Sequence, residues 1–357
     1  MKAFEKNIRK VVPYVPGEQP QNKVVKLNTN ENPYPPSPKV REALQKIDTE
    51  RFRLYPDPTS GGLVEALAEY YHVEPEQVFV GVGSDDVLSM CFLTFFNSEK
   101  PVLFPDVTYS FYKVWAELYR IPYECPKLDA EFRIVKDDYK RENGGIIFPN
   151  PNAPTAIYEE LDVVEEIIRE NQDVIVIVDE AYVDFAGRSA MELIAKYENL
   201  IVVQTFSKAR SMAGMRIGYA ISNPRLIRYL NDVKYSFNSY TMDQTALVCG
   251  VEAVKDQEYF VRTTKTILET REWAKKELAG LGFVFPDPRA NFIFARHPAY
   301  TGRELFEMLK QKNIYVRHWD TERIADYLRI TIGTKEEMQQ LFDCLRDYME
   351  EESHLIL

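Results

Sequence analysis

Lys208 is the residue of this sequence whose position and neighbours point most clearly to chemistry. It follows Leu200–Val203, a short apolar run that is typical of a buried parallel strand, and in open α/β sheets ligands gather where such strands end. An isolated lysine at a strand end usually only extends its amine into water. Here Arg210 and Arg216 follow closely, and neighbouring cations favour the neutral amine. A neutral amine can attack a carbonyl carbon and form a Schiff base.

A second buried-strand pattern, Asp173–Asp179, ends in a carboxylate. Taken alone, Asp179 could equally be the N-cap of a following helix. If the two runs are strands of one sheet, however, Asp179 and Lys208 lie at the same rim. Pyridoxal phosphate requires such a pair, a lysine for its aldehyde and a carboxylate that keeps its ring nitrogen protonated as an electron sink.

Three motifs in this order carry a resemblance to a known family: Val178–Tyr182, Thr205–Ala209 and Ala213–Tyr219. They resemble the fold-type I, class II pyridoxal-phosphate-dependent aminotransferases, and within them the histidinol-phosphate aminotransferases. The resemblance extends from Tyr14 to about Gly333. It implies an α/β fold whose large domain has a mostly parallel sheet sandwiched by helices, together with a smaller α+β domain and an N-terminal arm.

The pattern along the chain predicts where these parts begin and end. Prolines exclude a long helix from residues 10–38, so we expect an extended arm over residues 1–38. The large domain is expected over 39–255, and the long amphipathic pattern of Gln257–Leu281 is expected to lead into a small domain over 256–357. That domain should combine helices and short strands: helices Gly302–Lys312 and Lys335–Glu350, and strands Phe283–Phe285, Asn291–Ala295, Ile314–Arg317 and Tyr327–Thr331.

The segment Val78–Asp86 predicts a strand, a glycine turn and the start of a helix. The third glycine of a dinucleotide-binding fingerprint is absent, because Asp86 stands in its place, which weakens a Rossmann interpretation. Gly83 and Ser84 at a helix N-terminus can still bind one phosphate through free backbone N–H groups and the helix dipole.

The resemblance implies roles for individual residues around the cofactor. Lys208 holds the cofactor and moves the proton, Asp179 pairs with the ring nitrogen, and Tyr182 acts near the ring oxygen. The implied cofactor-binding set is Tyr55, Gly83, Ser84, Asp85, Tyr109, Asn152, Asp179, Tyr182, Thr205, Ser207, Lys208 and Arg216. Tyr55 is expected to reach the cofactor phosphate of a neighbouring subunit, so the resemblance implies a homodimer with shared active sites.

Arg317 and Arg329 lie within apolar, strand-like contexts. Arginines there are more often solvated or in structural ion pairs. The resemblance assigns the anionic tail of the substrate to Arg329, and a second arginine suits a phosphate dianion. Tyr14 is expected to add a hydroxyl, and Asn30 to line the entrance. The implied reaction exchanges the amino group of histidinol phosphate, a phosphorylated amino alcohol, with 2-oxoglutarate in histidine biosynthesis, giving imidazole-acetol phosphate and glutamate.

Two positions depart from the usual motifs of this family. Thr29 stands in the asparagine-rich segment where alanine is usual, and Ala156 follows the proline-rich loop of Asn152 where glycine is usual. If that glycine elsewhere has a positive φ, Ala156 must adopt another turn or accept strain.

Three other functions fit parts of the same pattern. One is an aromatic amino-acid aminotransferase, and another is a lyase, threonine-phosphate decarboxylase, which shares the fold and the motifs. The third is a non-catalytic nucleotide-binding protein, which would carry no lysine-bound chromophore. Sequence does not show which substrate bond stands perpendicular to the cofactor ring, so it does not separate the lyase from the implied reaction, and it does not show which amino donor a transaminase would prefer.

Composition limits the partners and the setting. The 357 residues suffice for about two domains, and a net charge of −11 argues against nucleic acid and against an acidic membrane surface. Residues 1–10 contain no apolar stretch of a secretory signal, and the aliphatic runs are far too short to span a membrane. The four cysteines are scattered and the four histidines lack metal-ligand spacing. We therefore expect a reduced, cytoplasmic setting and no metal.

Overall fold

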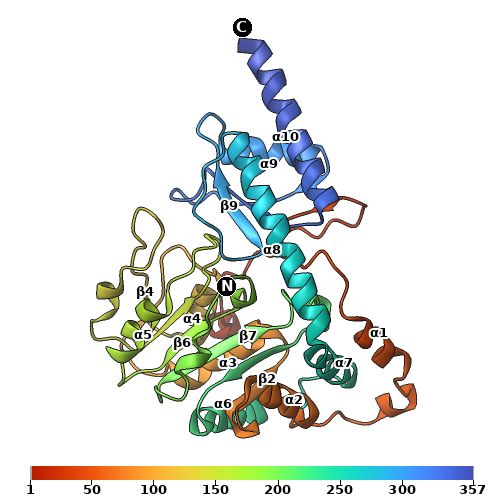
Figure 1. Ribbon diagram of the computed structural model, residues 1–357. Helices are drawn as coiled ribbons and strands as arrows, with labels where there is room; N and C mark the ends of the chain where they lie inside the picture. The colour runs from red at the N-terminus through yellow and green to blue at the C-terminus, as the bar shows by residue number, and fades with distance from the viewer. Residues whose placement is uncertain (1, 357) are drawn as a thin grey trace.

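A seven-stranded sheet lies at the centre of the large lower part of the molecule (Figure 1). The computed structural model describes residues 2–356. The sheet has the order β2-β8-β7-β6-β5-β3-β4, with β2 at Val78–Gly81, β3 at Val102–Leu103, β4 at Tyr123–Glu124, β5 at Gly145–Pro149, β6 at Val176–Asp179, β7 at Leu200–Thr205 and β8 at Gly218–Ile221. Only β8 runs antiparallel to its neighbours. The predicted mostly parallel sheet is confirmed.

Both faces of this sheet are covered, which explains why its strands are continuous apolar runs. Ile177 and Ile201 belong to the core on one face, whereas Val176 and Val202 belong to the core on the other. The first face packs against α3 (Gly83–Phe95), α4 (Phe111–Tyr119) and α6 (Pro224–Phe237). The second packs against α2 (Gly61–Tyr71), α5 (Leu161–Arg169) and α7 (Gln244–Lys255).

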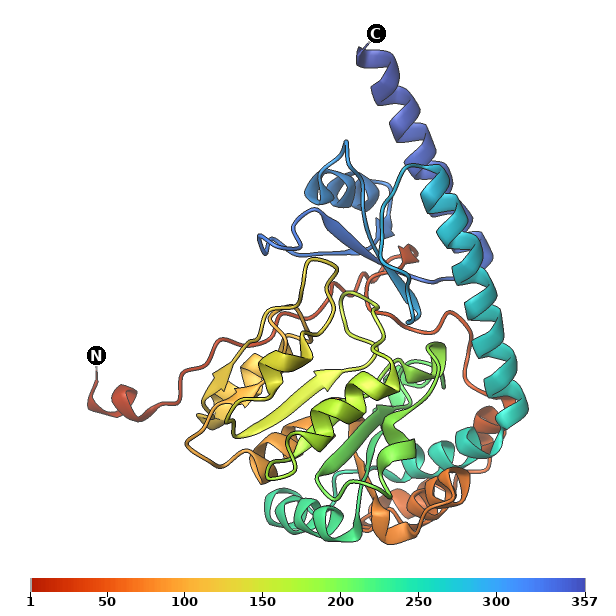
Figure 2. The ribbon, with the colours of Figure 1, turned by 60° about the vertical axis from the view of Figure 1, so that its left-hand side comes forward.

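The long helix α8 (Gln257–Gly280) runs from the lower part to the upper part of the molecule, as Figures 1 and 2 show. The upper part holds an antiparallel sheet in the order β11-β12-β9, formed by β9 (Phe292–Arg296), β11 (Arg317–His318) and β12 (Tyr327–Thr331). It packs with α8, α9 (Gly302–Gln311) and α10 (Lys335–Ile356) around one core.

Two of the strands expected in this part are wrong in detail. Phe283–Phe285 forms only an isolated bridge between Val284 and Arg296. The expected strand Ile314–Arg317 is split into β10 (Ile314–Tyr315) and β11, because β10 pairs with the N-terminal arm whereas β11 pairs with β12. A single apolar run can thus serve two sheets, which the residue pattern does not reveal.

The arm is extended, as predicted, and its middle is part of the upper core. Its strand β1 (Val25–Lys26) pairs in parallel with β10, and the following Leu27 is fully buried. After it the chain enters α1 (Pro38–Gln45), whose first turn is capped by Ser37. In Figure 2 the first residues extend away from the body. Short 3-10 helices complete the fold: η1 (Ala3–Asn7), η2 (Thr49–Arg53), η3 (Pro75–Gln77), η4 (Lys136–Tyr139), η5 (Val183–Phe185), η6 (Ala190–Leu193) and η7 (Ala213–Met215).

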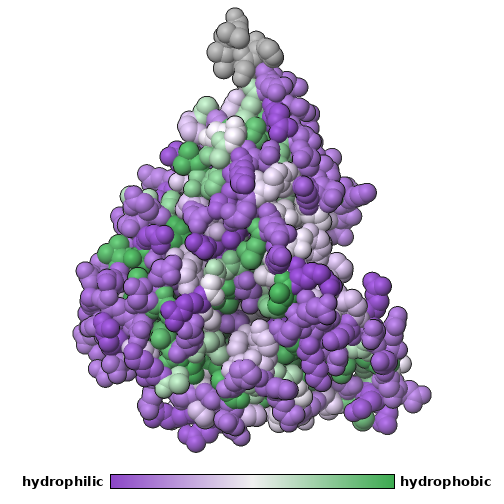
Figure 3. All heavy atoms as spheres, in the orientation of Figure 1, coloured by the Kyte–Doolittle hydropathy of each residue, from purple (hydrophilic) through white to green (hydrophobic). Residues whose placement is uncertain are grey.

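The surface is mainly polar on the face that Figure 3 shows, with hydrophobic side chains in small, separate groups. Among the described residues no helix combines the length and the apolar character that crossing a membrane requires. These observations agree with the charge-rich composition of the chain.

Leu27→Ala tests whether the arm is an integral part of the upper core. Leu27 contributes a fully buried side chain to that core, so its truncation should lower the free energy of unfolding by about 2–5 kcal/mol. Denaturant titration measures this change. The control Val12→Ala, at an arm position with 74% exposure, should change stability by no more than about 0.5 kcal/mol. A small effect at both positions would contradict the packing of the arm.

Candidate functional site

A cavity of about 440 Å³ lies where β5, β6 and β7 end, enclosed on its other sides by the arm and the upper sheet. Twelve of the residues singled out from the sequence line it: Tyr14, Asn30, Ser84, Asp85, Tyr109, Asp179, Tyr182, Ser207, Lys208, Arg216, Arg317 and Arg329. Residues distant in sequence therefore meet in one space, and the polar ones come from at least four separate segments of the chain.

Asp179 and Lys208 reach this cavity from neighbouring parallel strands. Asp179 is the last residue of β6 and pairs in register with Val203 of β7, and Lys208 follows three residues after β7 ends. The Lys208 Nζ donates a hydrogen bond to the Thr29 carbonyl of the arm at 3.1 Å. It also lies 5.6 Å from the centre of the Tyr182 ring. The amine is thus held over the cavity by a neutral carbonyl and an aromatic face.

The Asp179 carboxylate is buried and lies in a short hydrogen-bond network. Burial raises its pKa to about 6, although hydrogen bonds from the Tyr112 hydroxyl and the Ala181 N–H act in the opposite direction. The Tyr112 hydroxyl donates to Asp179 Oδ2 at 2.7 Å. The sequence reasoning missed Tyr112. Its signal was present, since Tyr112 follows Tyr109 by three residues at the start of a helix, a spacing that puts both rings on one side.

The start of α3 forms a cradle that excludes side chains. Gly83 has a φ of +85°, and a Cβ there would lie 2.5 Å from Nη2 of Arg216. A Cβ on Gly218 would lie 2.3 Å from the backbone nitrogen of Ser84. Only glycine fits at both positions, so the backbone N–H groups of the first turn stay close to the arginine. This combination of N–H groups, helix dipole and guanidinium fits a phosphate group.

Tyr109 and Asp85 stand beside this cradle. The Tyr109 hydroxyl donates to Asp85 Oδ1 at 2.7 Å, and Arg216 Nη2 lies 3.5 Å from Asp85 Oδ2. Burial, with the neighbouring carboxylate, raises the pKa of Tyr109 well above its usual range. The phenol therefore stays protonated and fixes the ring over the cavity.

Arg317 and Arg329 form the opposite end of the cavity. They are direct partners across β11 and β12. Arg329 donates to the Asn28 carbonyl at 2.9 Å and Arg317 to the Val15 carbonyl at 3.1 Å. No described carboxylate forms an ion pair with either arginine, and the buried Nε of Arg329 has no described partner. Two neighbouring cations without an acid make this end an anion site.

The arm supplies polar groups between the two ends. Asn30 Nδ2 donates to the Tyr182 hydroxyl at 2.9 Å, and the Asn30 backbone is fixed by Thr331. The Tyr14 ring stacks on Phe111 with centroids 4.2 Å apart. Thr29, where the family usually has alanine, provides the carbonyl for Lys208. The Thr29 hydroxyl accepts a hydrogen bond from Lys26, so the threonine side chain takes no part in the hydrogen bond to Lys208.

Three predicted cofactor residues lie behind the walls of the cavity rather than on them. Gly83 acts through its backbone, and the Thr205 hydroxyl hydrogen-bonds to Ser207 Oγ at 3.0 Å. The Asn152 amide donates to the Val107 carbonyl and to the Thr155 hydroxyl. Both of its N–H groups therefore have partners within the protein, and Asn152 presents no free donor to the cavity.

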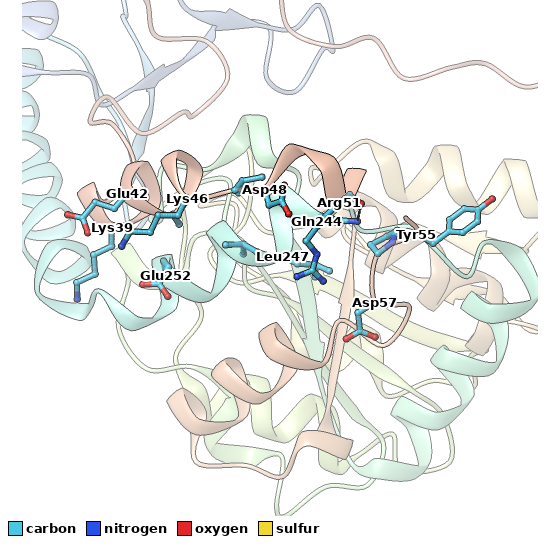
Figure 4. A pocket seen from close by; sticks show the side chains of 14 residues that line it. Lys39, Glu42, Lys46, Asp48, Arg51, Tyr55, Asp57, Gln244, Leu247 and Glu252 are labelled. Carbon is cyan, nitrogen blue, oxygen red and sulfur yellow. Dashed lines mark hydrogen bonds between the residues drawn. The ribbon is translucent and has the colours of Figure 1, made fainter. Parts of the chain in front are cut away.

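Tyr55 lies on another face of the molecule. It borders a hollow of about 570 Å³ between α1, η2 and α7, and Figure 4 shows its side chain directed outward. The side chain is 79% exposed and stacks on Tyr240 with centroids 4.5 Å apart. Within one chain Tyr55 does not reach the cavity that holds Lys208.

Two further expectations have clear outcomes. Ala156 has a φ of +62°, so this alanine accepts the left-handed conformation rather than adopting another turn. Arg210 was expected to crowd Lys208, and this is wrong. Its guanidinium donates to the Ala253 carbonyl and packs among the rings of Tyr70, Phe206 and Phe260, away from the cavity. Arg216 is the nearby arginine that lines the site.

Comparison with known proteins agrees with this geometry. The chain is 48% identical over 348 residues to a histidinol-phosphate aminotransferase of Clostridium botulinum (strain Okra / Type B1), covering 97% of this chain and 98% of the relative. It is 47% identical over 354 residues to that of Lactococcus lactis subsp. lactis (strain IL1403), covering 99% and 98%.

Two solved structures named as histidinol-phosphate aminotransferases share the fold. The one from Sinorhizobium meliloti, in complex with pyridoxal-5'-phosphate, has a TM-score of 0.82 at 22% identity, with 90% and 91% of the chains covered. The one from Clostridium acetobutylicum has a TM-score of 0.83 at 20% identity, with 91% and 99% covered. The family model for aminotransferase class I and II matches residues 22–345. With this match and the close relatives, the chain belongs to the class I and II aminotransferase family.

Proposed function

We propose that this protein transfers the amino group of histidinol phosphate to 2-oxoglutarate in histidine biosynthesis. The observation that carries the proposal is the pair Arg317 and Arg329 in the cavity of Lys208, two guanidinium groups that form no ion pair with an acid within residues 2–351. Histidinol phosphate has no carboxylate, and its phosphate supplies the dianion that two arginines suit. Relatives that are 47–48% identical over nearly the whole chain bear the name of this activity.

Pyridoxal phosphate is the cofactor of this family, and the residues present fit it. When bound, it supplies an aldehyde for the amino group and a protonated ring that takes up electrons from the substrate carbon. The cradle of Gly83, Ser84 and Arg216 would hold its phosphate, with Ser207 beside it. Asp179 would hold the proton on the ring nitrogen.

The proton chemistry belongs to Lys208. Its Nζ, held by the Thr29 carbonyl, would be the base that moves the proton between the substrate Cα and the aldehyde carbon of the bound cofactor. Tyr109, fixed by Asp85, would pack against the cofactor ring, and Tyr182 with Asn30 would offer hydrogen bonds to its ring oxygen. The enclosed cavity excludes water from these transfers.

The same cavity must accept a second substrate. 2-Oxoglutarate carries two carboxylates and no phosphate, so we assign its tail to Arg329, whose buried Nε has no hydrogen-bond partner among the described residues. Arg317, with the Tyr14 hydroxyl nearby, is assigned mainly to the phosphate of histidinol phosphate. Aromatic amino acids and threonine phosphate are the competing substrates, and a panel that compares amino exchange with CO₂ release distinguishes them.

The proposal includes a cytoplasmic homodimer. The outward position of Tyr55 on an exposed turn supports a role in a second subunit, where it would meet the cofactor phosphate. The division into an arm (1–38), a large domain (39–255) and a small domain (256–357) is part of the same proposal, and the two separate sheets support it.

The first test concerns Lys208. Borohydride treatment of the purified yellow protein should attach the cofactor irreversibly to Lys208, which peptide mapping by mass spectrometry would locate. The buried Lys234 serves as an internal control and should remain unlabelled. Lys208→Ala should keep the fold but lose amino transfer by several orders of magnitude. Near-parental turnover of this variant would refute the assignment.

The second test measures how much the burial of the Asp179 carboxylate lowers the free energy of unfolding of the cofactor-free protein. Its pKa is raised from 3.8 to about 6 by burial. Below about pH 4 the carboxyl is protonated in folded and unfolded chains alike and contributes nothing. Above about pH 6 it is ionised in both, and the folded state bears a cost of roughly 3 kcal/mol.

Asp179→Asn removes this cost, so the cofactor-free variant should be more stable than the parent by about 1–3 kcal/mol at pH 7. The difference should shrink between pH 6 and pH 4, as urea titrations at several pH values would measure. The same variant should slow the chemical half-reaction in stopped-flow measurements. Asp173→Asn, at an exposed position, is the matched control. A constant difference at all pH values would contradict the explanation.

The third test separates the two arginines. A charged hydrogen bond contributes about 1.5–3 kcal/mol, so Arg317→Ala should lower kcat/KM for histidinol phosphate roughly ten- to hundredfold. Phenylalanine, if accepted as an amino donor, should lose much less. Arg329→Ala should impair both half-reactions. Arg296→Ala, in the adjacent strand but outside the cavity, is the control. Equal losses on both donors from Arg317→Ala would favour the aromatic aminotransferase instead.

A further inference from the structure

Trp319 lies against both guanidinium groups of the anion site. The centre of its ring is 5.4 Å from Cζ of Arg317 and 5.2 Å from Cζ of Arg329. It follows β11 directly, two residues after Arg317, and is partly buried. None of the motifs that carry the family resemblance includes this residue.

Trp319 contacts the arginines from outside the cavity of Lys208. It lines a second cavity of about 350 Å³, which shares Arg317 and Arg329 with the first but does not include Lys208. The partition between the two cavities consists of these two arginines together with Tyr14, Tyr109 and Ala153, and the indole lines only the second cavity.

The indole offsets the electrostatic repulsion between the two arginines. Arg317 and Arg329 are direct cross-strand partners, and like charges in that arrangement repel each other. No described carboxylate pairs with either one. The electron-rich face of an indole attracts a guanidinium, and it does so most strongly where water is excluded. One ring in contact with both cations keeps them side by side before an anion arrives.

The two arginines depend on Trp319 to different degrees. Arg329 is also 5.3 Å from the Phe292 ring and donates to the Asn28 carbonyl. No second ring among the described residues lies over Arg317. Its hydrogen-bond partners are the Val15 and Pro16 carbonyls of the arm, and the Val15 side chain is 71% exposed. Loss of the indole should therefore release Arg317 far more than Arg329.

We propose that Trp319 is a positioning residue that determines specificity: it holds Arg317 ready for a phosphate dianion. This inference rests on the proposed function, because it deepens the assignment of Arg317 to the phosphate. It predicts that Trp319 affects the binding of phosphate-bearing donors and not the chemistry at Lys208, because the indole does not line the cavity of Lys208.

The test compares Trp319→Leu, which removes the π face, with Trp319→Phe, which retains a smaller one. Trp319→Leu should raise KM for histidinol phosphate about five- to thirtyfold, the range expected for loss of a desolvated cation–π contact, with kcat changed less than about twofold. Trp319→Phe should recover most of the loss. The absorption spectrum of the lysine-bound cofactor should be the same in all variants.

Trp273→Leu is the matched control. Trp273 also lies beneath a cation, with Lys335 Nζ 5.5 Å from its ring, and it packs on Phe342 outside the site. This variant should leave KM for histidinol phosphate unchanged. An altered cofactor spectrum in Trp319→Leu, or a loss that falls on kcat rather than on KM, would overturn the proposal.

Calorimetric titration of the holoenzymes with inorganic phosphate provides a readout without turnover. Trp319→Leu should weaken phosphate binding by a factor similar to its effect on KM, and Trp319→Phe by less. If the parent binds phosphate in this way but does not transaminate histidinol phosphate, the proposed substrate fails while the role of Trp319 stands. If Trp319→Leu binds phosphate as well as the parent, the role of Trp319 is refuted whatever the substrate is.

Discussion

The parallel pairing of β6 with β7 is the constraint on which the rest of the site depends. It brings the ends of both strands to one rim, with Asp179 as the last residue of β6 and Lys208 just beyond β7. Neither charge is neutralised by the other through a direct ion pair among the described residues. A buried carboxylate and a held amine thus face one cavity, an arrangement that costs stability unless a ligand with matching groups is bound.

Charges without a described partner of opposite sign also lie at the other end of the cavity. Arg317 and Arg329 repel each other, and their partners in the described part of the chain are carbonyls and aromatic rings. The protein therefore contains acidic and basic groups that do not compensate one another, although they share one space. Sites of this kind are expected where charges are reserved for a cofactor and for substrates. Hydrophobic packing in the surrounding cores offsets the loss of folding stability that these buried charges cause.

The arm joins these two ends into one site. Leu27 anchors it in the upper core, and from that anchor Thr29 reaches Lys208 while Asn30 reaches Tyr182. The arm also contacts Arg317 through the Val15 carbonyl. A change in the arm therefore affects the amine, the ring oxygen contact and the anion site together, even though the arm has little secondary structure of its own.

The sequence by itself predicted β2, β6 and β7 of the large sheet, the glycine turn at α3, the long helix α8 and the lysine–carboxylate pair, but not β4 or β8. Apolar runs, glycines and helical periodicity are local signals, and the family resemblance supplied the candidate residues for the cofactor site. Only the tertiary structure decided which side chains face the cavity. The guanidinium of Arg210 packs among aromatic rings away from the cavity, and both N–H groups of Asn152 form hydrogen bonds within the protein. The hydroxyl of Tyr112 donates to Asp179. The tertiary structure also placed Trp319 against two arginines, since contacts between separate strands depend on register and packing that no local pattern contains.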